Sequence, residues 1–229
     1  MKYILFSVFL GIVFLNATTL DKDKFNTGKK IYNETCISCH GKDGKSKTQM
    51  QLLVKPRDLS KTILDENQTY LITKFGARYW GAKADIMPSF KSVYNEYQLR
   101  SVAYFISHKF NANLQQRVEK LLKNCEPIPK NKDKKMKKWG KKIYKRNCSW
   151  CHGKNGHGNG LATKSPIDSI FPYDLTKTLL TNKQVFLYTK FGGHYFGTYK
   201  KDMPGWHKKY NDFRLHSVVK YVNEVIKGE

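Results

Sequence analysis

Hydrophobic residues recur along this chain at the three- and four-residue spacing of amphipathic helices. One such stripe predicts a helix over residues 97–110, and a second stripe predicts its counterpart near the C-terminus. The stripes consist of Leu99, Val102, Ala103 and Ile106, and of Leu215, Val218, Val219, Val222 and Val225. Shorter helices are expected over residues 25–32 and 64–75. Because stripes of this kind most often face a hydrophobic core, the pattern predicts an all-α fold.

The helical stretches belong to two copies of one sequence unit. Gly28–Tyr32 returns as Gly140–Tyr144, 112 residues later, and Pro56–Thr62 returns as Pro172–Thr178, 116 residues later. The second copy therefore carries four extra residues between these two segments. Order and register hold along both copies, so the chain is expected to be a tandem repeat.

Two small domains follow from the repeat, over residues 22–110 and 138–229. A glycine inside a helix costs about 1 kcal/mol against alanine, so Gly28 and Gly140 need a reason to be there. The reason we expect is the close approach of another helix, namely the last helix of the same unit.

The segment between the units, residues 111–137, has two parts. A further amphipathic helix is predicted by its apolar residues, which are Leu114, Val118, Leu121 and Leu122. Pro127, Pro129 and a run of lysines over residues 130–138 then predict an exposed, lysine-rich linker.

The N-terminus has the features of a secretory signal peptide. Lys2 precedes an apolar run over residues 3–15, and Ala17 offers a small residue at the expected cleavage point. The run is shorter than the about 20 apolar residues that a membrane-spanning helix needs. Residues 1–17 are therefore expected to be removed on export to the periplasm, and an uncleaved membrane tether is the alternative.

The chain is strongly basic, with 42 lysines and arginines and a formal net charge of +24. In a cytosolic protein this charge would suggest nucleic acid, but an exported protein rarely meets it, so no nucleic acid is expected. The expected partners carry an acidic docking surface, or are anionic lipid headgroups at a membrane surface. The alternative is that many of the lysines are merely solvated.

Cys36, Cys39 and His40 form a C-x-x-C-H motif, the attachment pattern of c-type haem. The same motif returns in the second copy as Cys148, Cys151 and His152. Two cysteines three residues apart share one face of a helical turn, so both can form thioether bonds to the vinyl groups of one porphyrin. The histidine that follows can then bind the iron.

Two C-x-x-C pairs are also compatible with a zinc site, a thioredoxin-like redox pair or disulfides. A zinc site would join motifs 112 residues apart and would leave His40 and His152 unexplained. A thioredoxin-like pair belongs in a βαβ context, which the helical pattern does not supply. A disulfide within C-x-x-C is usually catalytic rather than structural. Haem attachment is therefore the preferred interpretation of both motifs.

A Met-Pro pair follows each haem motif at a matched position. Met87 and Met203 are the expected sixth iron ligands, since a thioether can bind haem iron and raises its potential. The proline that follows fixes the local backbone and helps to aim the sulfur. His194 is the histidine that could displace Met203. Aromatic residues suited to cover a flat apolar group lie near both pairs: Tyr79, Trp80, Phe90, Tyr195, Phe196 and Trp206.

Cys125 lies outside both motifs, at the start of the linker. It is either a buried thiol or a site at which two chains could be joined by a disulfide. Ligation of a haem by Cys125 is disfavoured, because both units already carry a Met-Pro pair.

Each unit resembles a class I cytochrome c domain, and the whole chain resembles a tandem two-haem bacterial cytochrome c. The resemblance covers residues 22–110 and 138–227 and is carried by the C-x-x-C-H motifs, the Cys-His-Gly-Lys continuation after each, and the Met-Pro pairs. It implies two all-helical domains whose first and last helices cross beside a covalently attached haem c.

The function favoured by this resemblance is outer-sphere electron transfer by a periplasmic dihaem carrier without enzymatic activity. His/Met ligation closes both iron centres to substrate, and the expected donors and acceptors are respiratory redox proteins. A two-haem redox enzyme, of the peroxidase or thiosulfate-oxidoreductase type, is one alternative. The cytochrome subunit of a periplasmic dehydrogenase is the other.

Overall fold

The computed structural model describes residues 19–82, 87–128, 132–164, 172–198 and 203–228. All regular elements within these residues are helical, which confirms the expected all-α fold. No helix within them combines the length and apolar content that crossing a bilayer requires. The predicted signal peptide, residues 1–17, lies outside the described residues.

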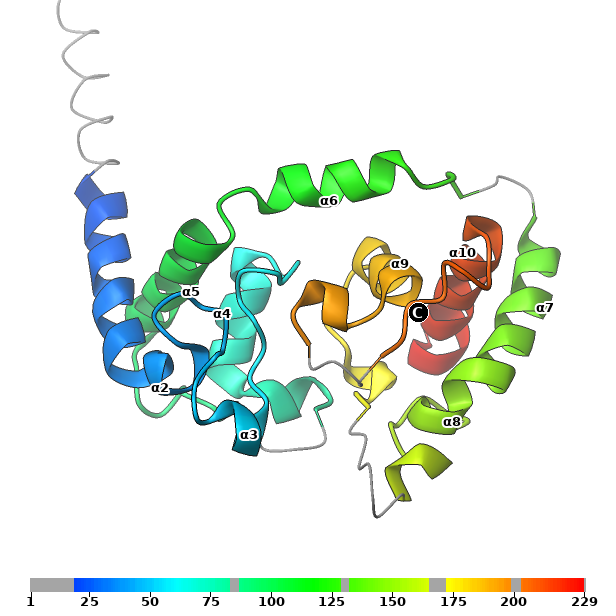
Figure 1. Cartoon of the computed structure of the whole chain (residues 1–229), viewed down its shortest axis with the longest axis horizontal. Coiled ribbons are helices and arrows are strands. Elements are labelled where there is room, and N and C mark those ends of the chain that lie inside the picture. Colours follow the sequence, from blue (N-terminus) through cyan, green and yellow to red (C-terminus); the bar gives the residue numbers. More distant parts are fainter. Residues whose placement is uncertain (1–18, 83–86, 129–131, 165–171, 199–202, 229) are drawn as a thin grey trace, which may run out of the picture.

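Both repeats place their helices in the same order (Figure 1). The first has a helix over residues 19–31, a π-helical turn at Tyr32–Cys36, α2 (Ile37–His40), α3 (Gln51–Val54), α4 (Glu66–Phe75), a 3-10 turn at Ala77–Trp80 and α5 (Glu96–Phe110). The second begins with α7 (Asp133–Ile143), a π-helical turn at Tyr144–Cys148, α8 (Ser149–His152) and 3-10 turns at Leu161–Lys164 and Leu175–Lys177. It continues with α9 (Asn182–Phe191), a 3-10 turn at His194–Phe196, α10 (Asp212–Tyr221) and a π-helical turn at Val222–Lys227. The helix α6 (Leu114–Lys123) connects them.

Three of the helices begin with the same local device. An N-cap side chain accepts a hydrogen bond from the backbone of a glutamine three residues on, and the glutamine side chain accepts one from the N-cap backbone. These pairs are Asp65 with Gln68, Asn95 with Gln98, and Thr181 with Gln184. The capping pairs fix where α4, α5 and α9 start.

The first and last helices of each repeat cross at a glycine, as predicted. A Cβ on Gly28 would lie 1.9 Å from the Ser101 carbonyl oxygen, and one on Gly140 would lie 2.1 Å from that of Ser217. Ser101 lies on α5 and Ser217 on α10, so glycine is what allows the helices to touch.

The lysine-rich segment differs from its prediction as an exposed linker. Its second half is the first turn and a half of α7, which begins at Asp133. Met136 on this helix is only 3% exposed and Ile143 only 4%. Lysine favours helices almost as well as the best formers, so the charged residues cover the outer face while the apolar ones bind the core.

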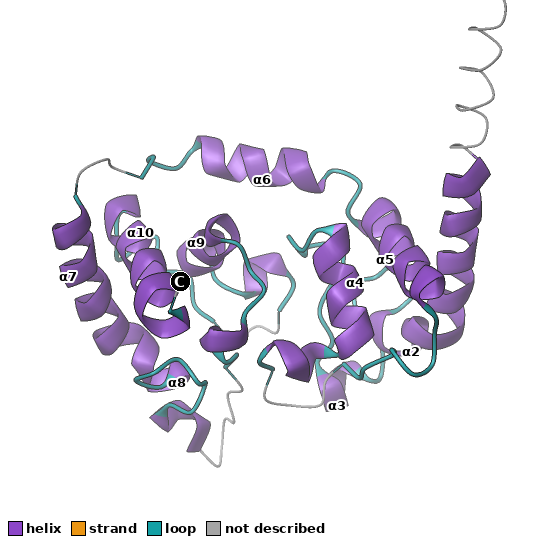
Figure 2. Ribbon diagram, turned by 180° about the vertical axis from the view of Figure 1, so that it is seen from behind, coloured by secondary structure: helices purple, strands orange, loops and turns teal. Residues whose placement is uncertain are grey.

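The helix α6 forms as predicted and lies along both repeats (Figures 1 and 2). Its apolar residues Leu114, Val118, Leu121 and Leu122 pack against the core of the second repeat. Arg117, next to this apolar face, donates hydrogen bonds to the carbonyl oxygens of Ser60, at 3.0 Å, and Lys61, at 2.9 Å. The connection is therefore packed onto both repeats rather than extended freely between them.

The two repeats contact each other through matched positions. The Asp58 amide donates to the Gly197 carbonyl at 2.9 Å, and the Asp174 amide donates to the Gly81 carbonyl at 2.8 Å. Asp174 and Gly197 each stand 116 residues after their first-repeat equivalents. Each repeat thus uses the same surface, so the contact is isologous, as in a twofold-symmetric dimer.

Candidate functional site

The two motif histidines have the same environment. The imidazole Nδ1 of His40 donates to the Arg57 carbonyl oxygen at 3.1 Å, and that of His152 donates to the Tyr173 carbonyl oxygen at 3.0 Å. This hydrogen bond fixes the tautomer and leaves Nε2 with its lone pair for a metal. Arg57 and Tyr173 occupy matched positions after the Pro56 and Pro172 of the repeats.

Burial favours the neutral form of both imidazoles. Burial lowers the pKa of His40 and of His152 below the ordinary histidine value, and it outweighs the opposing carbonyl hydrogen bond. A neutral imidazole is the form that binds a metal ion, so no proton has to be removed on ligation.

The motif cysteines suit thioether attachment better than thiolate chemistry. Burial raises the pKa of Cys36 to about 12 and that of Cys148 to about 12, and it also raises the pKa of Cys151. An uncharged sulfur is therefore favoured at these positions. Within the described ranges, no group of three or more histidine, cysteine or acidic residues is placed to hold a metal ion.

A narrow apolar gap, too tight for a water molecule, lies beside the first motif. It is lined by Cys36 together with residues of α4 and α5, among them Thr73, Leu99 and Val102. A flat, largely apolar porphyrin attached at Cys36 and Cys39 requires apolar neighbours of this kind. The donor set and the apolar lining thus suit a haem c group, for which the surrounding side chains would have to move apart.

Each Met-Pro segment is pinned to the end of the helix before it. The Met87 carbonyl accepts a hydrogen bond from the Ala77 amide at 3.0 Å, and the Met203 carbonyl accepts one from the Gly193 amide at 2.8 Å. Gly192, just after α9, has a φ of +85° and would place a Cβ 2.8 Å from the Met203 carbonyl oxygen. Glycine is therefore required there for both conformation and space.

Aromatic rings stack next to these segments in both repeats. The rings of Phe75 and Tyr79 lie 5.0 Å apart, and those of Phe191 and Tyr195 lie 5.3 Å apart. Tyr79 and Tyr195 are nevertheless 60% and 53% exposed, so they form the outer layer. In the second repeat Phe196 is completely buried under this pair.

His194 and Cys125 form hydrogen bonds with residues other than those of the motifs. His194 is exposed, and its Nδ1 donates to the Thr198 carbonyl at 3.4 Å. The Cys125 thiol donates to the Leu121 carbonyl at 3.1 Å and accepts from the Lys190 Nζ at 3.2 Å. Cys125 is thus a partly buried thiol that belongs to the contact between the linker and α9.

Sequence reasoning overlooked the residues that support the motifs. The Tyr32 hydroxyl donates to the Gly41 carbonyl at 2.7 Å, and the Tyr144 hydroxyl donates to the Gly153 carbonyl at 2.9 Å. Each bond ties the helix before a motif to the turn after it. Tyr32 and Tyr144 occupy matched positions in the two repeats, and this match could have indicated their shared role.

Comparison with known proteins agrees with this arrangement. The family model described as cytochrome C oxidase, cbb3-type, subunit III matches residues 23–106 and again residues 136–222. Among solved structures, the chain is similar to one in the Kuenenia stuttgartiensis reducing HAO-like protein complex Kustc0457/Kustc0458, with a TM-score of 0.48 and 22% sequence identity. That match covers 87% of this chain and 96% of the other. No curated protein matches the chain.

Proposed function

The chain belongs to the family of cytochrome c domains that includes subunit III of cbb3-type oxidases, in a tandem of two, and on this basis we propose that it is a periplasmic electron carrier with one haem c in each domain. The paired motif histidines, each with Nδ1 held by a backbone carbonyl and Nε2 left for iron, carry the proposal. The first is His40 and the second is His152.

Each bound haem c supplies an iron that alternates between Fe(II) and Fe(III). In the first repeat Cys36 and Cys39 would hold the group by thioether bonds, and His40 and Met87 would supply a nitrogen and a sulfur to its iron. The second repeat would use Cys148, Cys151, His152 and Met203 in the same roles. Carbonyl hydrogen bonds orient each imidazole, and ligation by the methionines would exclude water and substrate from the iron.

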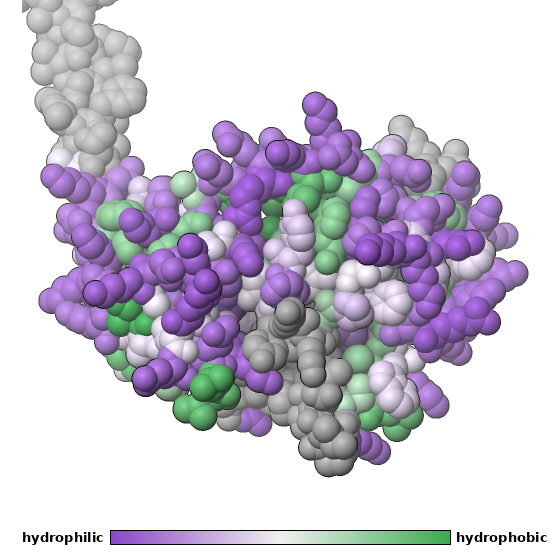
Figure 3. Space-filling model, in the orientation of Figure 1, coloured by the Kyte–Doolittle hydropathy of each residue, from purple (hydrophilic) through white to green (hydrophobic). Residues whose placement is uncertain are grey.

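The net charge supports an acidic redox partner. A protein of charge +24 is steered toward negative surfaces, and the effect weakens as salt is added. Hydrophilic side chains cover most of the face seen in Figure 3. An anionic membrane surface offers the same charge, so it is the competing target in the experiments below.

One side chain marks a docking point at the second haem site. Trp150, between Cys148 and Cys151, is 59% exposed, whereas the matched residue of the first repeat is Ser38. Leu161 is 60% exposed and follows Gly160, where an added Cβ would lie 2.2 Å from the Trp150 carbonyl oxygen. Exposed aromatic residues are enriched where proteins dock, so we place the partner here.

The haem content tests the proposal directly. A pyridine haemochrome assay of the exported protein should give two haem c groups per chain, and fewer would overturn the two-site assignment. Reversible reduction without carbon monoxide binding is expected of closed centres. Peroxide turnover by the reduced protein would instead favour the enzyme, and co-purification with a dehydrogenase in fixed ratio would favour the subunit alternative.

Docking can be tested on electrodes of defined charge. The protein should adsorb and exchange electrons on a gold electrode coated with a carboxylate-terminated monolayer, but not on an amine-terminated one, and salt should weaken the signal. Trp150→Ala should slow electron exchange, while the matched Ser38→Ala should not. Equal slowing by both variants would remove the docking assignment. Binding to anionic vesicles with no electrode response would favour the membrane surface.

A further inference from the structure

We propose that Arg57 makes the first haem site sensitive to the contact between the two repeats, as a positioning residue that acts through His40. The inference rests on the proposed function, because it concerns the potential of one of the two haem groups. It assigns different behaviour to two sites whose motifs are the same.

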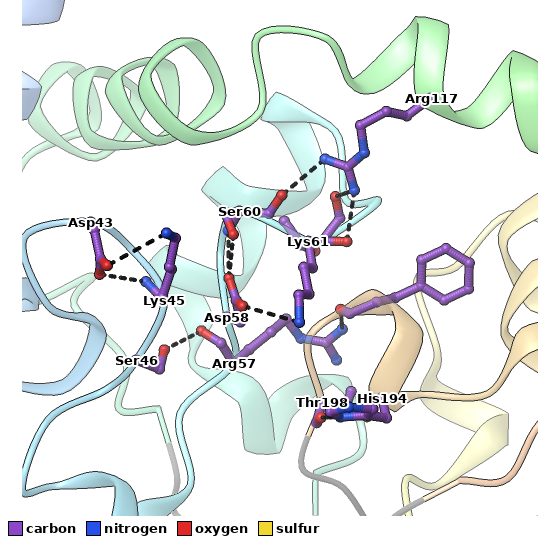
Figure 4. A network of polar contacts seen from close by, with 12 residues as sticks. Asp43, Lys45, Ser46, Arg57, Asp58, Ser60, Lys61, Arg117, His194 and Thr198 are labelled. Carbon is purple, nitrogen blue, oxygen red and sulfur yellow. Dashed lines mark hydrogen bonds and ion pairs between the residues drawn. The ribbon is translucent and has the colours of Figure 1, made fainter.

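Arg57 contacts the first repeat through its main chain and the second repeat through its side chain. Its carbonyl oxygen accepts the hydrogen bond from His40 Nδ1 at 3.1 Å and one from the Ser46 hydroxyl at 2.6 Å. Its guanidinium Nη1 donates to the Tyr188 hydroxyl at 2.5 Å and to the Phe196 carbonyl at 3.3 Å, both in the second repeat. Figure 4 shows the side chain extending from its loop toward the segment that carries His194.

The second repeat is connected differently. Tyr173 stands where the first repeat has Arg57, and its carbonyl holds His152 at 3.0 Å. Its side chain is neutral and 38% exposed, and it contacts the Arg57 guanidinium. The position matched to Tyr188 is Ile72, which offers no hydroxyl. The residue whose carbonyl holds the motif histidine is therefore charged and reaches the core of the other repeat only in the first haem site.

The guanidinium is a cation without a described acidic partner. The adjacent Asp58 accepts hydrogen bonds from the Ser60 amide, at 3.0 Å, and hydroxyl, at 2.6 Å, and lies 3.8 Å from the Lys61 Nζ. An arginine guanidinium is not deprotonated in proteins, so the charge is permanent. A fixed positive charge near an iron centre favours its reduced state.

Loss of the Arg57 guanidinium has two effects. The loop that carries the His40 acceptor is released from the second repeat, so the imidazole is held less firmly. The nearby positive charge also disappears. Both changes lower the potential of the first haem. His152 is reached only through the side chain of Tyr173, so the second haem should respond less.

The experiment measures the potentials of both haems in the full-length holoprotein. Spectroelectrochemical titration gives the two potentials, and the hyperfine-shifted NMR signals of each haem identify the centre. Arg57→Gln removes the charge and the guanidinium donors, whereas Arg57→Lys keeps the charge. Tyr188→Phe keeps Arg57 but removes the hydroxyl that accepts its hydrogen bond. Arg100→Gln is the matched control, since Arg100 lies exposed on α5 and pairs with Glu96.

Arg57→Gln should lower the reduced-to-oxidised ratio of the first haem several-fold at a fixed applied potential and change that of the second haem less. Arg57→Lys should restore part of that loss, and Tyr188→Phe should give a smaller shift of the same sign. Equal shifts of both haems, no shift in either, or the same shift in Arg100→Gln would overturn the inference. Absence of two reversible haems in the unaltered protein would instead overturn the proposed function itself.

Discussion

Gln68 and Gln184 exchange two hydrogen bonds across the boundary between the repeats, amide to amide, at 2.8 and 2.7 Å. Each glutamine also donates to a backbone carbonyl of the other repeat, Gln68 to Leu179 at 3.0 Å and Gln184 to Ile63 at 2.6 Å. The four bonds obey the same twofold relation as the rest of the interface. Both side chains are buried, so neither amide has water as a substitute partner.

Removing either glutamine should destabilise the whole molecule. Gln68→Leu or Gln184→Leu leaves buried polar groups unpaired and should lower the free energy of unfolding by about 1–3 kcal/mol. In the double variant the costs should not add, because the two side chains share bonds. Urea unfolding of the holoprotein measures all three variants.

The matched control for this pair is Gln98→Leu. Gln98 forms the same capping pair on α5 with Asn95 but bonds no residue of the other repeat. We expect it to cost only about 1 kcal/mol. If the losses in unfolding free energy of Gln68→Leu and Gln184→Leu add in the double variant, the two glutamines act as independent caps.

Alanine at the crossing glycines should push the helices apart. Gly28→Ala and Gly140→Ala would gain helix propensity, worth about 1 kcal/mol, but would place a methyl group within 2.1 Å or less of a backbone carbonyl oxygen. Overpacking of this kind costs about 1–3 kcal/mol, so we expect both variants to be less stable than the unaltered protein. Thermal unfolding should show a lower Tm for both. Lys29→Ala, at an exposed position of the same helix, should leave Tm nearly unchanged.

Loss of a methionine ligand should open one haem and spare the other. Met87→Ala or Met203→Ala should remove half of the near-infrared methionine–iron band, lower one potential and allow one carbon monoxide to bind per chain. Met136→Leu alters a buried core methionine and should do none of these things. An unchanged spectrum in either alanine variant would show that the mutated residue is not a ligand.

Acid should weaken the contact between the linker and α10. Burial lowers the pKa of His216, whose ring stacks on Phe186 at 3.9 Å and whose Nε2 donates to the Glu126 carbonyl at 3.1 Å. The fold therefore prefers neutral His216. Its contribution is fully present above the unfolded pKa of about 6.5 and is lost as pH falls through the lower folded value.

This pH dependence can be measured by comparing unfolding at pH 7.5 and at pH 5. His216→Gln, which cannot titrate but can still donate to Glu126, should lose less stability between the two conditions than the unaltered protein. His108→Gln, exposed on α5, should behave like the unaltered protein. Equal losses in the His216 variant and the unaltered protein would exclude His216 as the source.

Much of the fold followed from the repeated pattern of hydrophobic residues. The helices α4 and α5 begin and end within two residues of their predicted limits, and the close approach at Gly28 and Gly140 is confirmed. The described lysines of the run are exposed as predicted, but its second half is helical, because lysine also has a high helix propensity. In that run Met136 was the one apolar residue that could have indicated a buried face.

The contacts between the repeats could not be predicted in the same way. Gln68 and Gln184 each have a complete local explanation as capping residues, and Arg57 has one as a charged residue in a loop. Their second partners become visible only once the two repeats are placed against each other. The histidine, cysteine and methionine assignments remain predictions, supported by the hydrogen bonds of His40 and His152.

The isologous contact has a consequence for the history of the chain. Since both repeats present the same surface, a single-domain ancestor would have carried both halves of the interface and could have paired with an identical copy of itself. Gene duplication followed by fusion through α6 would then replace a concentration-dependent homodimer with a permanent one. In such a homodimer, the positions of Arg57 and Tyr173 would have to be the same residue. A fused chain is free of that constraint, so the two halves of its interface can differ.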